Sequence, residues 1–468
     1  MATESIRLEG MPTHEGDLSI ELHGMEPIPE TARYGSAGRV FTVWFTPNLV
    51  PAAFFIGTLV TLDFLKLGFV TSLLAILVGN VLGSAVVGIL STMGPKTGMA
   101  QLPAARLPFG KSIVVPALLN WISTIGWDGI NSLFGAIALT LLIPALPFPV
   151  ALLIIVLCQG ALGIFGYEAI HLFERWGAIA LGIMFAILTV AILGQADTTL
   201  KDGFSGADQI GAFIAYVAIV ASFVLAWSLY ASDYSRYLPT STSPSRIFWN
   251  TLLGMAVASI WLEILGLLVA TKATGGESSD TIFGLLGGSG NIMAMLAMVA
   301  IAVGTVAVNA MNDYTGSLSL QAAGFRVKRI YSAAIVAVLG YLFTLYLQSS
   351  NDFALNFFNF LLFISYWISP FVGVVLVDWL LRRQRADVSR LSDYGMLPSG
   401  AVALTALAVG FAVGIPFQNS SLGYAWGGPF NYITATYLHG ADLAYYVGGI
   451  VAAVIYWIGA GRSVRSGA

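Results

Sequence analysis

The sequence predicts an all-α integral membrane protein with twelve transmembrane helices. Of its 468 residues, 57% are apolar and only 10% are charged, whereas a typical soluble domain carries about 25% charged residues. The apolar residues gather in long runs, and the basic residues collect in alternate segments between these runs. Together these observations exclude a disordered, fibrous or disulfide-stapled protein.

Twelve apolar runs approach the roughly 20 residues that a helix needs to cross the hydrocarbon core. They lie near residues 41–62, 69–91, 113–142, 147–166, 176–194, 209–231, 248–271, 291–320, 330–348, 353–380, 399–416 and 442–460. Residues 1–40 are polar and lack the basic-then-apolar layout of a cleaved signal peptide. We expect them to form a mostly unstructured cytoplasmic tail.

The distribution of Lys and Arg predicts the orientation, because cytoplasmic loops carry an excess of both. With the amino terminus inside, eighteen of the 21 basic residues fall in inner segments, and only Lys66, Lys201 and Lys272 fall in outer ones. We therefore expect a multi-pass protein of the plasma (inner) membrane with both termini in the cytoplasm. The basic residues form no stripe, so nucleic acid is not an expected partner.

The sequence gives little support to an enzyme. The four histidines include no pair at the spacing of metal ligands on a helix, and no nucleophile elbow of the Gly-x-Ser-x-Gly type occurs. We therefore expect no catalytic residues, no cofactor and no resident metal. A membrane enzyme or a channel stays an alternative, but neither clustered ligands nor a filter-like segment is present.

The first apolar run is interrupted by polar residues and prolines. Thr46, Pro47, Asn48 and Pro51 lie near its middle, and each proline removes a backbone donor and disturbs the helix. Freed carbonyls at membrane depth are tolerated only where they line a cavity or are buried in protein. The pattern predicts a discontinuous helix that lines a site, with a simple kink as the alternative.

The third and eighth runs carry the most polar side chains. In the third, Trp127 and Asn131 are four residues apart and share a helical face, which suits a flat heterocycle that stacks and is read at its edge. An ordinary packed tryptophan is the alternative. In the eighth run, Asn309, Asn312 and Asp313 exceed what bonding between helices usually needs, so we expect a site there.

Charged residues elsewhere in the spans have less definite roles. Glu263 is a lone acid in the seventh run and is either a packing residue or functional. Asp233 and Arg236, at the inner end of the sixth run, have the i, i+3 spacing of an ion pair. We expect this pair to fix a helix end or an inner gate.

The segment around these two residues resembles a family signature. Residues 231–239 read ASDYSRYLP and are similar to the signature of the purine-cytosine permeases of nucleobase-cation-symport family 1. Residues 44–48 (WFTPN), 94–110 and 377–383 (VDWLLRR) resemble other segments of that family. The resemblance implies a LeuT-type fold, in which helices 1–5 and 6–10 form two inverted repeats and helices 11 and 12 are added. It implies a transporter core at 41–390, after the tail at 1–40, and a region at 391–468 with the last two helices.

The resemblance also implies roles for single residues. Trp127 matches the family's stacking tryptophan, Asn131 a polar contact one turn later, and Asn312 a substrate-binding asparagine. The second aromatic stacker aligns near 222–224, which makes Phe223 the candidate. The substrate-binding candidates are thus Asn48, Trp127, Asn131, Ser222, Phe223, Asn309 and Asn312.

The coupling ion predicted from the sequence is the proton. Sodium-coupled relatives offer helix 8 hydroxyls where this chain has Val306 and Ala307, so a sodium site would have only Thr46 and Thr305 nearby. Burial in lipid disfavours the charged form of a carboxyl, and an intramembrane carboxyl can therefore load and release a proton. The proton-coupling candidates, in order, are Asp313, Asp128 and Glu263.

We therefore expect a monomeric secondary transporter in the lipid bilayer that imports a nucleobase, a purine or cytosine, by proton symport with alternating access. The alternative within transport is a proton- or sodium-coupled permease for another flat amide-bearing solute, such as allantoin or a hydantoin.

Overall fold

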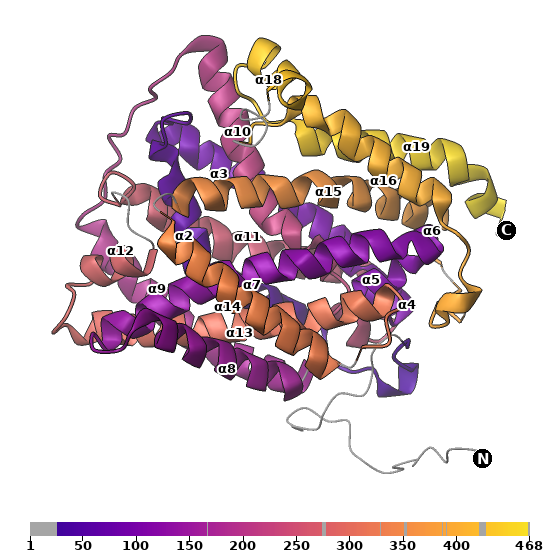
Figure 1. Ribbon diagram of the computed structural model, residues 1–468, viewed down its shortest axis with the longest axis horizontal. Helices are drawn as coiled ribbons and strands as arrows, with labels where there is room; N and C mark the ends of the chain where they lie inside the picture. Colours follow the sequence, from indigo (N-terminus) through magenta and orange to yellow (C-terminus); the bar gives the residue numbers. More distant parts are fainter. Residues whose placement is uncertain are drawn as a thin grey trace.

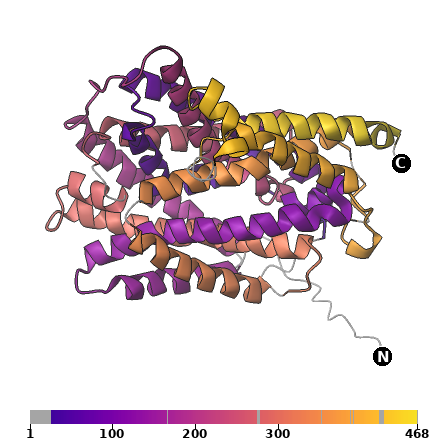
Figure 2. The ribbon, with the colours of Figure 1, turned by 45° about the horizontal axis from the view of Figure 1, so that its top comes forward.

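The computed structural model describes residues 26–165, 167–273, 278–327, 329–350, 353–385, 387–389, 391–420 and 427–466. Over these residues the chain is helical and contains no strand. Figures 1 and 2 show long helices packed side by side, with α8 along one edge of the molecule and the pair α16 and α19 along the opposite edge.

The long helices follow the predicted runs. They are α3 (Phe69–Ser91), α7 (Val114–Leu142), α8 (Phe148–Phe165), α9 (Tyr167–Leu193), α10 (Gly206–Leu225), α11 (Pro244–Leu268), α13 (Ile292–Ala322), α14 (Arg329–Ser349), α15 (Phe353–Leu381), α16 (Ala401–Gly414) and α19 (Ala444–Ser466). Short helices join them: α4 (Met93–Thr97), α5 (Gln101–Ala104), α6 (Arg106–Phe109), α12 (Ser278–Leu285) and α18 (Tyr432–Tyr437).

By length and composition, eight helices of the described chain can cross a membrane. A bent pair near the amino terminus makes a ninth span, and three shorter apolar helices lie in α8, α9 and α16. Each of the twelve predicted runs therefore corresponds to a helix or a bent pair. Lipid-facing side chains such as Ile183 and Val190 are largely exposed, as expected of a chain that is solvated by acyl chains.

The first span is discontinuous, as its two prolines predicted. Helix α1 (Ala37–Phe45) continues into a 3-10 turn, η2 (Thr46–Asn48), and α2 (Pro51–Thr58) leaves at an angle of 60°. The sixth span also changes form, since α10 gives way to the 3-10 helix η5 (Ala226–Leu229) without a proline or glycine at the change. The span stays one continuous helix from Gly206 to Leu229, and its change to 3-10 geometry has no signal in the sequence.

The helices form two packed groups. In one, α3 packs against α10 and α11, and α11 packs against α1 and α2. In the other, α7 packs against α13 and α14, and α13 packs against α8 and α9. The break between α1 and α2 and the junction of α10 with η5 belong to the first group, whereas the polar helices α7 and α13 belong to the second.

The last part of the predicted tail, residues 26–40, contacts the helical core, and α1 begins within it at Ala37. From Glu26 onward the chain is described, and its Arg33 donates hydrogen bonds to the carbonyls of Ile28 (2.8 Å) and Pro95 (2.6 Å). Glu30 accepts hydrogen bonds from the backbone and side chain of Thr240, both at 2.9 Å. The end of the tail is thus attached to the segments that contain Pro95 and Thr240.

Two glycines allow α2 and α11 to pack closely against each other. A Cβ atom on Gly266 would lie 2.0 Å from the carbonyl oxygen of Phe54, and one on Gly57 would lie 2.0 Å from that of Glu263. No side chain fits there, which is the use that membrane helices make of small residues.

We therefore expect Gly266→Val to lower the thermal unfolding midpoint of the purified protein, because overpacking a tight contact destabilises by about 1–3 kcal/mol or more. Gly182→Val in α9 is the matched control, since nothing lies within 4 Å of a Cβ atom at that position. Equal midpoints for the two variants would contradict the close approach.

Candidate functional site

A small cavity lies where the break between α1 and α2 and the junction of α10 with η5 meet the polar helices. Its volume is about 20 Å³, which is room for about one water molecule, so the cavity is nearly closed. The first group of helices supplies Pro47, Val50, Phe223, Ala226, Trp227 and Tyr230, and the second supplies Trp127, Asn131, Val308 and Asn312. Four of the predicted substrate-binding residues (Trp127, Asn131, Phe223 and Asn312) therefore come together around one space.

The aromatic wall is built from α7 and from the end of α10. Trp127 contacts Phe223 edge to face, with ring centroids 5.9 Å apart, and on α15 it contacts Phe360 at 5.1 Å and Phe357 at 6.5 Å. Trp227, one turn after Phe223, also lines the cavity. Because Trp127 and Phe223 touch, a flat ligand can lie between them only when the two rings separate.

The polar wall is made by amides of α7 and α13 and by one hydroxyl. Tyr230 donates a hydrogen bond of 2.9 Å to Oδ1 of Asn312. Nδ2 of Asn312 and Nδ2 of Asn131 both donate to Oδ1 of Asn309, at 3.3 Å and 3.1 Å. Amide donors and acceptors at the edge of an aromatic pocket can read the hydrogen-bonding edge of a flat heterocycle.

Behind this wall, hydrogen bonds continue to a buried carboxyl. Nδ2 of Asn309 donates to Oε1 of Gln159 (2.8 Å) and to Ser132 (2.9 Å). Nε2 of Gln159 in α8 donates to Oδ1 of Asp128 in a short hydrogen bond. Asn309 is thus a link between the cavity and Asp128, and its side chain is not among those that line the cavity.

Two other candidates hold helices together and do not line the cavity. Asn48 is fully buried, donates to the carbonyl of Trp44 (2.7 Å) and accepts from Ser259 of α11 (3.2 Å). The Ser222 hydroxyl donates to the carbonyl of Ala218 in its own helix (2.7 Å) and lies 2.8 Å from the hydroxyl of Ser365 in α15. Each residue is thus bonded both within its own span and to a neighbouring helix.

The three candidate carboxyls for proton coupling are all buried but have different partners. Within the described chain, neither oxygen of Asp313 has a hydrogen-bond partner, and Oδ2 of Asp128 has none either. Glu263 accepts a 2.6 Å hydrogen bond from Asn80 of α3. A Cβ atom on Gly340 of α14 would lie 2.0 Å from Oδ2 of Asp128, so this glycine makes room for the carboxyl.

Asp233 and Arg236 lie buried after the last turn of the sixth span and bind other elements. Asp233 accepts from the backbone of Gln101 (2.9 Å) and from Thr315 (2.5 Å). Arg236 donates to the hydroxyl of Tyr314 (2.7 Å). Both therefore tie this end to α5 and α13, and the ion pair between them stays a prediction.

The two possible sodium ligands engage different helices. The Thr46 hydroxyl donates to the carbonyl of Thr42 (3.0 Å), and the Thr305 hydroxyl donates to that of Asn131 (3.4 Å). Over the residues that can be described, no group of three or more His, Cys, Asp or Glu side chains could hold a metal ion.

Sequence reasoning missed Tyr230, Trp227 and Gln159. Tyr230 and Trp227 follow the change to 3-10 geometry at Ala226, which the sequence does not indicate. Their orientation toward the cavity could therefore not be inferred from α-helical periodicity. Gln159 is a lone amide in an otherwise apolar run, and an intramembrane polar side chain is itself a signal of function. That signal was present and was not used.

Comparison with known proteins places the chain among permeases. Residues 27–451 match a family model described as permease for cytosine/purines, uracil, thiamine, allantoin. The chain is 28% identical to the purine-cytosine permease fcyB of Emericella nidulans, with 94% of this chain and 88% of that protein covered. It is also 28% identical to the putative purine-cytosine permease YxlA of Bacillus subtilis, with 94% and 96% covered.

Among solved structures, the chain is similar to Mhp1, a nucleobase-cation-symport-1 family transporter. The TM-score is 0.75 to its closed conformation with bromovinylhydantoin bound, at 20% identity, with 96% of this chain and 97% of that chain covered. For the inward-facing conformation the TM-score is 0.73 at 21% identity, with 96% of each chain covered. These likenesses confirm the predicted LeuT-type fold.

Proposed function

The chain belongs to the family of permeases for cytosine/purines, uracil, thiamine and allantoin, and we propose that it imports a purine or cytosine by proton symport across the plasma membrane. The observation that carries the substrate class is the cavity, where aromatic faces from Trp127, Phe223 and Trp227 adjoin the amides of Asn131 and Asn312. A nucleobase is flat and carries donors and acceptors on its edges, so it matches both walls. Two relatives of this chain, fcyB and YxlA, are named as a purine-cytosine permease and a putative purine-cytosine permease.

A hydantoin is the second candidate substrate. The structurally similar transporter Mhp1 was solved with bromovinylhydantoin bound, and a hydantoin is also a flat ring with amide edges. A thermal-shift screen of the purified protein distinguishes the two classes, because a ligand that binds only the folded form stabilises it by mass action. Stabilisation by hydantoins and by no nucleobase would overturn the nucleobase proposal.

Transport by alternating access fits the division of the helices. The cavity lies between the group that contains α1, α2, α3, α10 and α11 and the group that contains α7, α8, α9, α13 and α14, and each group supplies part of its lining. A rocking movement of the first group against the second would separate Phe223 from Trp127 and admit the base. Counterflow of labelled substrate in liposomes tests for a carrier, and uptake that shows no counterflow would indicate a channel.

The contacts favour Asp128 as the coupling carboxyl. An ionised carboxylate only accepts hydrogen bonds, so it orients Gln159 with Nε2 toward Asp128 and Oε1 toward Asn309. Asn309 then turns its Oδ1 toward Asn312 and Asn131. A protonated Asp128 carboxyl can instead donate to Oε1 of Gln159, and the Gln159 amide then turns around. The donor and acceptor orientation of the following amides reverses as well, so that donors replace acceptors, or the reverse, at the edge that faces the substrate. Proton binding is thereby linked to substrate binding.

The stacking role gives a direct prediction. We expect Trp127→Ala to weaken nucleobase binding by well over tenfold, because an aromatic pair contributes about 0.5–1.5 kcal/mol beyond the burial of its area, and that burial is lost as well. Binding to purified protein and uptake in cells both measure the effect. Phe360→Leu is the control, since Phe360 contacts Trp127 but does not line the cavity. Unchanged affinity in Trp127→Ala would refute the stacking role.

A further inference from the structure

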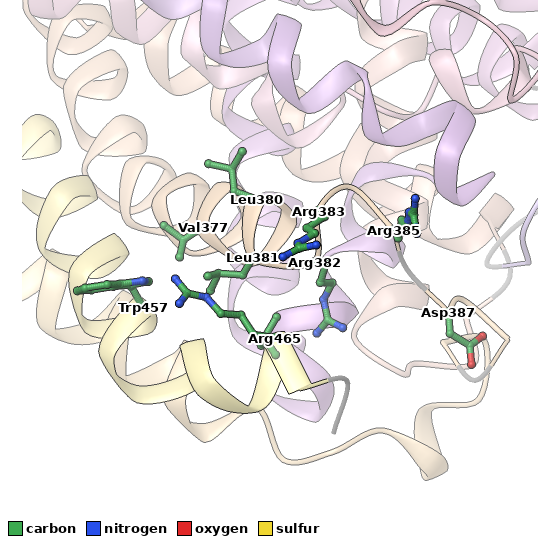
Figure 3. A pocket seen from close by; sticks show the side chains of 10 residues that line it. Val377, Leu380, Leu381, Arg382, Arg383, Arg385, Asp387, Trp457 and Arg465 are labelled. Carbon is green, nitrogen blue, oxygen red and sulfur yellow. The ribbon is translucent and has the colours of Figure 1, made fainter.

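A second hollow lies far from the substrate cavity, between the end of α15 and the last turns of α19. Figure 3 shows four arginines around it, Arg382, Arg383 and Arg385 from the end of α15 and Arg465 from α19. One acidic residue, Asp387, also lines it, and the rest of the lining is apolar: Val377, Leu380, Leu381, Trp457 and Val464. Both sequence segments belong to the inner side in the orientation that the distribution of basic residues predicts.

The backbone at Arg383 adopts a conformation that favours glycine. Its φ is 52°, and that of Gln384 is 59°. The amide of Gln384 donates to the carbonyl of Trp379 (3.0 Å), and the amide of Arg383 donates to that of Leu380 (3.0 Å), so the helix ends in a Schellman motif with Arg383 at the position that glycine usually holds. An arginine there is strained relative to glycine, and strained residues gather at functional sites.

The hollow carries an excess of positive charge. Arg382 is bound to Asp378 at 2.7 Å, and Asp378 also accepts from Tyr456 at 2.8 Å. With Asp378 and Asp387 counted against the four arginines, two positive charges are in excess. In the part of the chain that is described, no ion pair is formed by Arg383, Arg385 or Arg465.

The other wall of the hollow is apolar and faces outward. Leu380 is 62% exposed and Trp457 is 53% exposed, although both are large apolar side chains in membrane-crossing helices. Exposed apolar residues in such a helix face acyl chains, and a tryptophan near the helix end is typical of the headgroup level. The apolar wall is continuous with the arginines in Figure 3.

We propose that this hollow binds one anionic phospholipid of the inner leaflet, with its phosphate among Arg383, Arg385 and Arg465 and an acyl chain along Leu380 and Trp457. Arginine is suited to phosphate because its planar guanidinium donates two parallel hydrogen bonds. Basic pockets between helices on the cytoplasmic side are of the kind that holds anionic headgroups. A free anion would use the arginines alone, whereas a lipid uses both walls.

The test compares the thermal unfolding midpoint of the full-length protein in neutral detergent after addition of phosphatidylglycerol, phosphatidylcholine, glycerol 3-phosphate or inorganic phosphate. We expect phosphatidylglycerol to raise the midpoint and the other three to leave it within error. The double variant Arg383→Gly with Arg465→Gln should lose this response. Arg383→Gly relieves the backbone at that position, and retained nucleobase binding reports that the variant is folded.

Arg246→Gln is the matched control, because Arg246 is an exposed inner-side arginine outside the hollow. It removes one positive charge and should keep the full response to phosphatidylglycerol. An equal response in the wild type and the double variant would overturn the proposal. So would stabilisation by inorganic phosphate as strong as that by the lipid, since it would assign the arginines to a soluble anion.

Discussion

Replacing Asn312 by alanine is expected to abolish measurable nucleobase binding while the amount of folded protein in the membrane stays unchanged. Asn312 lines the cavity and bonds both Tyr230 and Asn309. Its loss removes the bond to the base and leaves buried polar groups unpaired, at roughly 1–3 kcal/mol each. Two such unpaired groups together lower the affinity for the nucleobase by on the order of a hundredfold or more. Equilibrium binding to purified protein measures it.

Two further variants locate the effect. Tyr230→Phe keeps the ring and removes only the donor to Asn312, so we expect a smaller loss of affinity than in Asn312→Ala. Asn309→Ala acts from behind the cavity and is expected to weaken binding through the orientation of Asn131 and Asn312. Normal binding by Asn312→Ala together with lost binding by Asn309→Ala would mean that α13 presents a different face to the substrate.

The elements that could be predicted from the sequence are those whose signal is local. Two prolines in one apolar run predicted the break between α1 and α2, because proline removes a backbone donor wherever the rest of the chain lies. The four-residue spacing of Trp127 and Asn131 predicted a shared face, and both line the cavity. The change to 3-10 geometry after Leu225 could not be predicted in this way, since residues 222–229 contain neither glycine nor proline.

What could not be predicted depends on neighbours that are distant in sequence. Asn48 lies in the broken segment, yet its amide is occupied by Trp44 and by Ser259 of α11. Gln159 gains its importance only because α8 and α13 bring it between Asp128 and Asn309. A polar residue in a span can be recognised from sequence, but its partner is set by packing.

Replacing Asp128 by asparagine is expected to uncouple transport. Labelled nucleobase should still exchange across the liposome membrane, but it should not accumulate against a gradient. In the wild type, uptake should rise as external pH falls from about 8 to about 6, because the proton is a second ligand that acts by mass action, and a protonophore should collapse it. Gln159→Leu keeps the carboxyl but breaks its link to Asn309, so affinity should become independent of pH in that variant.

The other two carboxyls serve as comparisons for this prediction. Glu263→Gln should remain coupled, because the carboxyl of Glu263 accepts its hydrogen bond from Asn80 within the first group of helices, and in the described chain no hydrogen bond links this carboxyl to the cavity. Asp313→Asn tests the first choice of the sequence analysis, and uncoupling in Asp313→Asn with normal accumulation in Asp128→Asn would move the proton to Asp313. Accumulation that follows a sodium gradient and ignores a pH gradient would refute the proton altogether. It would direct attention to Thr46, Thr305 and the carbonyls at the break of the first span, where a sodium ion would then have to bind.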